Sequence, residues 1–171
     1  MAKVSPSVTG IIPMKKLILA ATHAGCLALG FALGIYLLPI LTQPESPDIA
    51  VIEESLQEAS YRRTTFDRNR ADSDAFHWGE GELRVYQNTV VFKGALSPGP
   101  DYRLYLTPDY IETESEFLAI KERSQQVGRI STFEGFVLDV TDVGNLAFDH
   151  VVIWCETFSQ FITSGSLTQD T

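Results

Sequence analysis

The sequence predicts a mainly β protein: a small antiparallel β-sandwich or barrel-like domain with one short helix, preceded by a single transmembrane helix. Residues 17–41 contain no Asp, Glu, Lys or Arg, which is typical of a membrane span. From residue 76 onward, short runs rich in β-branched and aromatic residues alternate with Gly, Pro, Asn and Asp, as in sandwiches and barrels. The strongest of these runs, residues 149–158, predicts a strand at the centre of the sheet.

The uncharged segment is long enough to cross a bilayer, because a helix needs roughly 17 to 25 residues to do so. A cleavable signal peptide is the alternative, but its apolar region is about 7 to 15 residues long and ends at a small-residue cleavage site that is not evident here. A lipoprotein would use Cys26, yet His23 stands where that pattern has an aliphatic residue. We therefore expect an uncleaved helix that contacts the lipid bilayer through residues 17–41.

The lysines around this helix predict its orientation. Lys3, Lys15 and Lys16 precede it, whereas the first basic residue after it is Arg62. Because positive charges flank the cytoplasmic end of a membrane helix, we expect residues 1–16 to be cytoplasmic and the C-terminal domain to be periplasmic or extracellular.

Two glycines inside the span, Gly30 and Gly34, have the Gly-x-x-x-Gly spacing that lets two membrane helices approach closely. This spacing predicts a homodimer seam. Glycine is common in membrane helices, so a plain anchor without a seam is the alternative.

Residues 42–75 are expected to be a linker. Ile49, Ile52 and Leu56 have helical spacing and predict a short helix there, as a surface connector or a dimer seam. Residues 61–75 mix arginines with aspartates and have few apolar positions, which predicts a tether that holds the folded domain away from the bilayer.

The folded domain is expected to occupy residues 76–168. Its pattern predicts seven strands, at residues 81–86, 89–96, 102–107, 124–132, 135–140, 150–157 and 161–167. Thr113 and Glu116 have the spacing of a capping box, which predicts a short helix within residues 113–123.

The strand at residues 150–157 is predicted to be apolar on both faces. Successive side chains of a strand point to opposite sides, so Val151, Ile153 and Cys155 share one face, and Val152 and Trp154 share the other. A strand of this kind belongs to a sheet that is covered on both faces.

The same stretch carries a resemblance to a known family. Val151-Val152-Ile153-Trp154-Cys155, followed by Phe158, Phe161 and Leu167, resembles the C-terminal signature of the electron transfer DM-thirteen domain, a small β-rich module that also occurs in membrane-anchored bacterial proteins. Further similar blocks follow the same order and cover about residues 76–168: Val91-Phe92-Lys93-Gly94-Ala95-Leu96, Tyr102-Arg103-Leu104-Tyr105-Leu106-Thr107, Gly128-Arg129-Ile130 and Gly135-Phe136-Val137-Leu138. The resemblance implies an extracytoplasmic electron-transfer module.

Cys155 is the candidate redox residue of that module. A thiol can be oxidised reversibly or can bind haem iron or a soft metal, so haem or a redox metal would be the cofactor, with Trp154 beside it. His77 and His150 are the only histidines outside the span and are the candidate further metal ligands. His150 lies five residues from Cys155, on the opposite face of a regular strand, and would need a bulge to join it. The alternative is an inert thiol buried in the core.

Composition excludes several functions. Residues 45–171 contain all 22 acidic residues of the chain, so the domain is acidic and is not expected to bind nucleic acid. No nucleophile elbow, phosphate loop or Cys-x-x-Cys motif is present in the sequence, which disfavours an enzyme. Two hypotheses remain: an electron-transfer module acting through Cys155 with an unknown partner, or a non-catalytic binding module with a structural cysteine.

Overall fold

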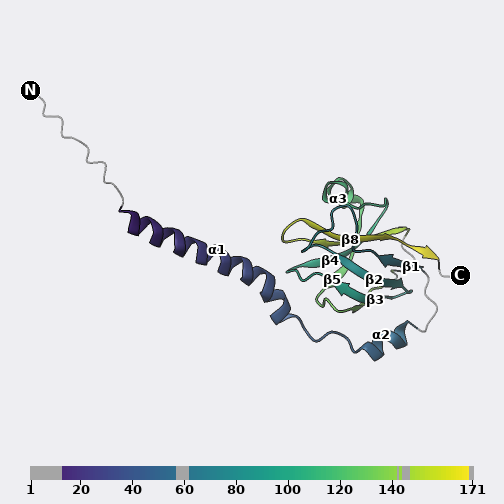
Figure 1. Cartoon of the computed structure of the whole chain (residues 1–171). Helices are drawn as coiled ribbons and strands as arrows, with labels where there is room; N and C mark the ends of the chain where they lie inside the picture. The colour runs from purple at the N-terminus through teal and green to yellow at the C-terminus, as the bar shows by residue number, and fades with distance from the viewer. Residues whose placement is uncertain (1–12, 57–61, 142, 144–146, 170–171) are drawn as a thin grey trace, which may run out of the picture.

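The computed structural model describes residues 13–56, 62–141, 143 and 147–169. The first helix, α1 (Met14–Thr42), projects from one side of a β domain, and the short helix α2 (Ile49–Ser55) lies against that domain (Figure 1). Among the described residues, α1 alone is long and apolar enough to cross a membrane. It extends the predicted span by a few residues at its N-terminal end and by one at its C-terminal end.

The described part of the β domain contains nine strands in two antiparallel sheets, which confirms the predicted fold class. The first sheet has the order β6-β3-β2-β1-β9 and the second has the order β5-β4-β7-β8. The strands are β1 (Arg62–Phe66), β2 (Gly79–Val85), β3 (Thr89–Leu96), β4 (Tyr102–Thr107), β5 (Gln125–Ile130), β6 (Phe136–Asp139), β7 (His150–Cys155), β8 (Gln160–Ser166) and β9 (Thr168–Gln169).

The main hydrophobic core lies between the two sheets. Phe66, Leu83 and Phe92 enter it from the first sheet, and Leu104 and Ile153 enter it from the second. The ring of Phe92 packs at centroid distances of 5.5 Å from Phe66 and 5.1 Å from Phe136. Because one cluster contains side chains of both sheets, the domain is a β-sandwich.

Strand β7 is covered on both faces, as its sequence predicts. It lies between β4 and β8. Val151, Ile153 and Cys155 belong to the core between the sheets, whereas Val152 and Trp154 belong to a second cluster on the other face.

Helix α3 (Glu114–Ile120) provides that second cover. Its N-terminus has the predicted capping box, in which the Thr113 hydroxyl accepts from the Glu116 amide and the Glu116 carboxylate accepts from the Thr113 amide. Its Phe117 packs on Trp154 at a centroid distance of 4.7 Å. A 3₁₀ turn (Lys121–Arg123) follows directly and leads into β5.

The ordered domain begins earlier than the sequence indicates. Residues 62–66, expected in a tether, form β1, which pairs along its whole length with β2. Thr64 and Phe66 point inward and are buried, while the alternate residues face outward and give the segment its polar character. The expected short helix is present as α2, and its Ile52 is buried with Tyr86 and Val91 on the outer face of the first sheet.

Candidate functional site

Cys155 is the last residue of β7, and its side chain is 2% exposed. It lies opposite Tyr102 of β4 in the register of the second sheet. Burial raises the pKa of the Cys155 thiol above its ordinary value, and backbone hydrogen bonds, the largest with Phe158, offset only part of that effect. The thiol is therefore neutral at physiological pH.

A cavity of about 360 Å³ adjoins Cys155 at the end of the domain that meets α1. Its lining comes from the last turns of α1, the segment before β2, the turn between β3 and β4, and the turn after β7. The lining residues are mostly apolar or aromatic: Ala32, Ile35, Tyr36, Phe76, His77, Pro98, Gly99, Pro100, Tyr102, Cys155 and Phe158. Four segments far apart in sequence thus form one small-molecule-sized hollow.

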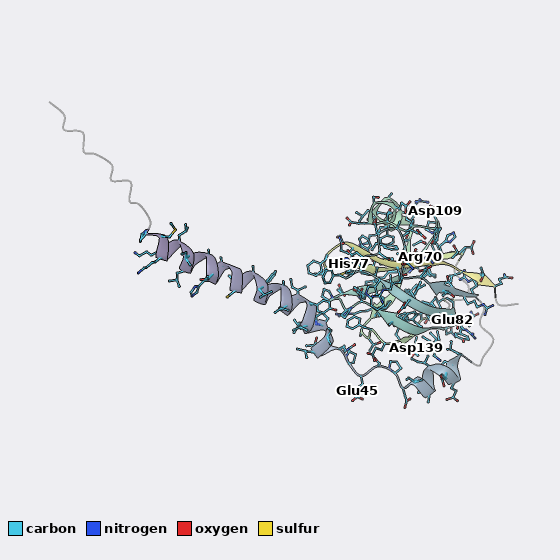
Figure 2. The ribbon with its side chains drawn as sticks, in the orientation of Figure 1. Glu45, Arg70, His77, Glu82, Asp109 and Asp139 are labelled. Atoms are coloured by element: carbon cyan, nitrogen blue, oxygen red, sulfur yellow. The ribbon has the colours of Figure 1, made fainter. Side chains whose placement is uncertain are left out.

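His77 brings an imidazole ring to this cavity. Its Nδ1 lies 3.0 Å from a carboxylate oxygen of Asp74, and the other oxygen of Asp74 accepts from the amides of Phe76 and His77 at 2.6 and 2.8 Å. Burial opposes ionisation of Asp74, but these hydrogen bonds outweigh it and lower its pKa. Asp74 therefore fixes the imidazole, which lies on the side of the domain facing α1 (Figure 2).

Tyr102 forms part of the wall beside Cys155. Its hydroxyl lies 3.3 Å from Ser97 Oγ, and its ring packs edge-on against Phe133 at 5.9 Å. Burial raises the pKa of Tyr102, so its hydroxyl stays protonated at physiological pH. Gly99 makes room for this ring, because a Cβ at that position would overlap it.

The structure brings together two of the predicted site residues, Cys155 and His77. His150 lies at the other end of β7, about 16 Å along the strand. Trp154 points to the opposite face and packs under α3, and its Nε1 has no hydrogen-bond partner among the described residues. Asp74, Ser97 and Tyr102 were not expected from the sequence, although an aspartate three residues before a histidine is a signal that could have been noticed.

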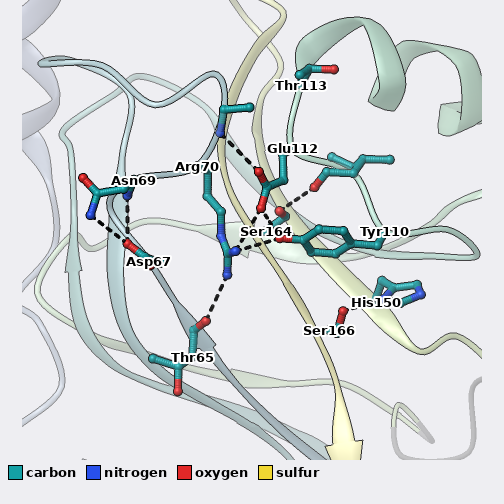
Figure 3. A network of polar contacts seen from close by, with 12 residues as sticks. Thr65, Asp67, Asn69, Arg70, Tyr110, Glu112, Thr113, His150, Ser164 and Ser166 are labelled. Atoms are coloured by element: carbon teal, nitrogen blue, oxygen red, sulfur yellow. Dashed lines mark hydrogen bonds and ion pairs between the residues drawn. The ribbon is translucent and has the colours of Figure 1, made fainter.

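His150 lies beside a polar network around Arg70 (Figure 3). Its ring is 5.8 Å from that of Tyr110, and its Nδ1 is 3.1 Å from Ser166 Oγ. Arg70 donates to the Tyr110 hydroxyl at 2.7 Å and to Glu112 at 2.9 Å, and the Tyr110 hydroxyl also donates to Glu112. This network ties the segment after β1 to the segment before α3.

The residues around Cys155 fit a small apolar group better than a metal ion. Within the described parts of the chain, no three or more His, Cys, Asp or Glu side chains are grouped so that they could hold a metal ion. The cavity offers one thiol and one imidazole, whereas protein metal sites commonly use three or four ligands. Cys and His are also the usual axial ligands of haem, so the haem or metal role of Cys155, His77 and His150 stays a prediction.

The β domain is similar to a known protein family. The family model described as Electron transfer DM13 matches residues 66–167, more than half of the chain. No curated protein and no solved structure matches the sequence. The matched region contains every cavity residue that the β domain supplies, but it does not include α1.

Proposed function

We propose that the β domain of this chain, which belongs to the electron transfer DM13 family, is an electron-transfer module. In this proposal α1 anchors the domain in the membrane, the domain lies outside the cytoplasm, and Cys155 is its redox group. The observation that carries this proposal is the position of Cys155 in the wall of a ligand-sized cavity. Cys155 is the single cysteine of the β domain, since the other cysteine of the chain, Cys26, lies within α1.

The protonation state of the thiol governs how it would give up an electron. Because burial raises its pKa, Cys155 is a neutral thiol, so the transfer of one electron from it to an external electron acceptor would also release its proton. Among the described residues that line the cavity, His77 has a ring nitrogen that can accept a proton, and Asp74 holds this ring in place through Nδ1. We assign His77 to the binding of that proton.

The location outside the cytoplasm is supported by charge. Lys15 and Lys16 precede the apolar part of α1, and the chain has no further basic residue until Arg62. The positive-inside rule then directs the N-terminus to the cytoplasm and the β domain to the periplasm or the cell surface.

A binding module with a structural cysteine is the second candidate function. The observation that favours it is the nearly complete burial of a neutral thiol, since reactive cysteines commonly have a lowered pKa and partial exposure. In that case the cavity, and not the thiol, would be the functional feature.

The experiment that separates these functions is a redox titration of the full chain in lipid nanodiscs, on a Cys26→Ala background. Its absorption spectrum and metal content are recorded first, and the oxidation state of Cys155 is then followed against solution potential. We expect a reversible midpoint that is absent in Cys155→Ser, with unchanged circular dichroism. A colourless, metal-free protein whose thiol reacts only after denaturation would overturn the redox role and leave the binding module.

A further inference from the structure

With α1 crossing the membrane as proposed, the cavity would lie at the outer boundary of the hydrocarbon core. Lys15 and Lys16 mark the inner boundary of α1. A hydrocarbon core of about 30 Å takes up about 20 residues at 1.5 Å per residue, which places the outer boundary near Tyr36. Tyrosine is enriched at that level. Ala32, Ile35 and Tyr36 all line the cavity, so its α1 wall coincides with the edge of the bilayer.

The rim of the cavity is suited to lipid and not to water. Phe76 and Phe158, from two different turns of the β domain, are 62% and 45% exposed. The ring of Phe76 packs edge-on against the ring of Tyr36, with 6.2 Å between the ring centroids, so this part of the rim contacts α1. Two large exposed rings at the level of Tyr36 would lie among the lipid head groups and upper acyl chains. The cavity therefore opens toward the outer leaflet.

The interior excludes charged ligands. No carboxylate, lysine or arginine is found among the described residues that line it, so an ionised head group would be buried without a partner. The walls instead offer aromatic faces from Tyr36, Phe76, Tyr102 and Phe158, which favour a flat ring.

The polar groups of the interior are few and suit a neutral acceptor. The Tyr102 hydroxyl is held by Ser97, and the His77 imidazole is held through Nδ1 by Asp74, which leaves Nε2 for a ligand. A carbonyl oxygen of such a ring can accept from the Tyr102 hydroxyl. Because the Nδ1–H of His77 is directed at Asp74, its Nε2 is an acceptor, which suits the ring hydroxyl of the reduced (quinol) form of the same ligand. A saturated or acyl-chain ligand has no such acceptor.

We propose that this cavity binds the head-group ring of a lipid-soluble quinone, which enters from the outer leaflet. A volume of about 360 Å³ lies within the roughly 300 to 1,000 Å³ of small-molecule sites. The inference rests on the proposed function, because it supplies that module with a membrane-resident electron carrier as its partner. It requires binding alone and no particular oxidation state of Cys155.

The test is saturable binding of a decyl-chain benzoquinone to the full chain in nanodiscs, with protein-free nanodiscs subtracted. Ala32→Trp fills the cavity from the α1 side without altering any residue of the β domain. Ala21→Trp makes the same change three turns deeper and is the matched control. We expect binding that Ala32→Trp weakens by about tenfold or more and that Ala21→Trp leaves unchanged.

A decylbenzene competitor distinguishes a quinone from an acyl chain. The proposal expects no competition, because decylbenzene lacks carbonyl oxygens. Equal competition would identify a lipid-chain pocket, and absent binding, or equal binding in the two tryptophan variants, would also overturn the proposal. Repeating the quinone titration in Cys155→Ser separates the two questions. If quinone binding persists in Cys155→Ser and the redox titration of the protein that retains Cys155 shows no midpoint, the thiol role alone is refuted.

Discussion

At the scale of single residues, Cys155 combines burial with access to a cavity. Its strand neighbours Val151 and Ile153 share its face and lie in the core between the sheets. The sequence predicts this face correctly, because alternation along a strand is a local property. It does not predict Tyr102 and His77 as neighbours of Cys155, since these three residues lie tens of positions apart in sequence and meet only after the sheets have formed.

The first prediction concerns the pH dependence of Cys155 reactivity. In the folded Cys26→Ala protein, the alkylation rate of Cys155 should rise with an apparent pKa above the ordinary value of 9.0, because burial disfavours the thiolate. The measurement is the rate of iodoacetamide labelling against pH, followed by mass spectrometry. In denaturant the same residue should titrate near its ordinary value, and a native pKa at or below 9.0 would contradict the prediction.

The same raised pKa has a consequence for stability. Above the pKa of the unfolded thiol, the unfolded state releases a proton that the folded state keeps, so the free energy of unfolding decreases as pH rises. The contribution of Cys155 is complete below pH 9.0 and is lost above it. Tyr102 acts in the same direction above pH 10.0, its own ordinary value.

At the scale of elements, the positions of most strands can be predicted from the sequence, but the pairing of strands within the sheets cannot. The expected bounds of β3 and β4 agree with the structure at both ends, and α3 begins where its capping box indicates. β1 and β9 were missed because their outward residues are polar and β9 has only two residues. These two strands pair with each other, from opposite ends of the domain, which no local pattern encodes.

The second prediction concerns the network that fixes β1 to α3. Glu112 accepts hydrogen bonds from Tyr110 and Arg70, and these lower the pKa of Glu112. We expect Glu112→Gln to reduce the free energy of unfolding at pH 7 by about 1–3 kcal/mol. Because the folded pKa lies below the ordinary 4.5, this cost should shrink as pH falls below 4.5 and through the folded value. Urea denaturation at several pH values measures it.

Glu122→Gln is the matched control for this change. Glu122 is an exposed glutamate in the 3₁₀ turn after α3, so its replacement should leave the urea midpoint unchanged. Equal effects of both variants, or a cost of Glu112→Gln that does not depend on pH, would show that the Arg70 network does not stabilise the fold.

The third prediction concerns the seam of α1, where we propose that Gly30 and Gly34 bring two copies of the chain together. A Cβ added at either position meets nothing within 4 Å, so a larger residue leaves this chain undisturbed. Gly30→Ile and Gly34→Ile should therefore weaken self-association without changing the β domain. Energy transfer between labelled copies in vesicles measures it, and Gly25→Ile, also open, is the control. Undiminished transfer in both variants would identify α1 as a plain anchor.

At the scale of the whole molecule, the described part of the connection between α1 and the β domain packs on the domain. Residues 43–48 contain Pro44 and Pro47 and lead directly into α2. Helix α2 then docks on the first sheet through the buried Ile52 and through an ion pair of 2.9 Å between Glu53 and Lys93. The ring of Phe76 packs on Tyr36 at 6.2 Å, so the domain lies beside the C-terminal part of α1, as Figure 1 shows.

The fourth prediction follows from this arrangement. If α1 is a wall of the cavity as well as an anchor, inserting a flexible Gly-Ser segment after Gln43 should leave the thermal unfolding of the β domain unchanged but separate Tyr36 from Phe76. Cys155 should then react faster with a water-soluble maleimide in nanodiscs on the Cys26→Ala background, because its cavity loses the lining of Ala32, Ile35 and Tyr36. An insertion of the same length at residue 99, in the turn between β3 and β4, is not a suitable control, because it would displace Tyr102.

The suitable control is an insertion of equal length after Gln43 that is built from helix-forming residues. It also moves the β domain away from α1, but the inserted segment is stiff instead of flexible. Faster labelling with both insertions means that contact with α1 itself covers the cavity. An unchanged rate with both means that the β domain closes the cavity without help, in which case α1 serves as an anchor only. The membrane helix would then contribute nothing to the site, and the quinone would have to be recognised by His77, Tyr102 and the two phenylalanines of the rim alone.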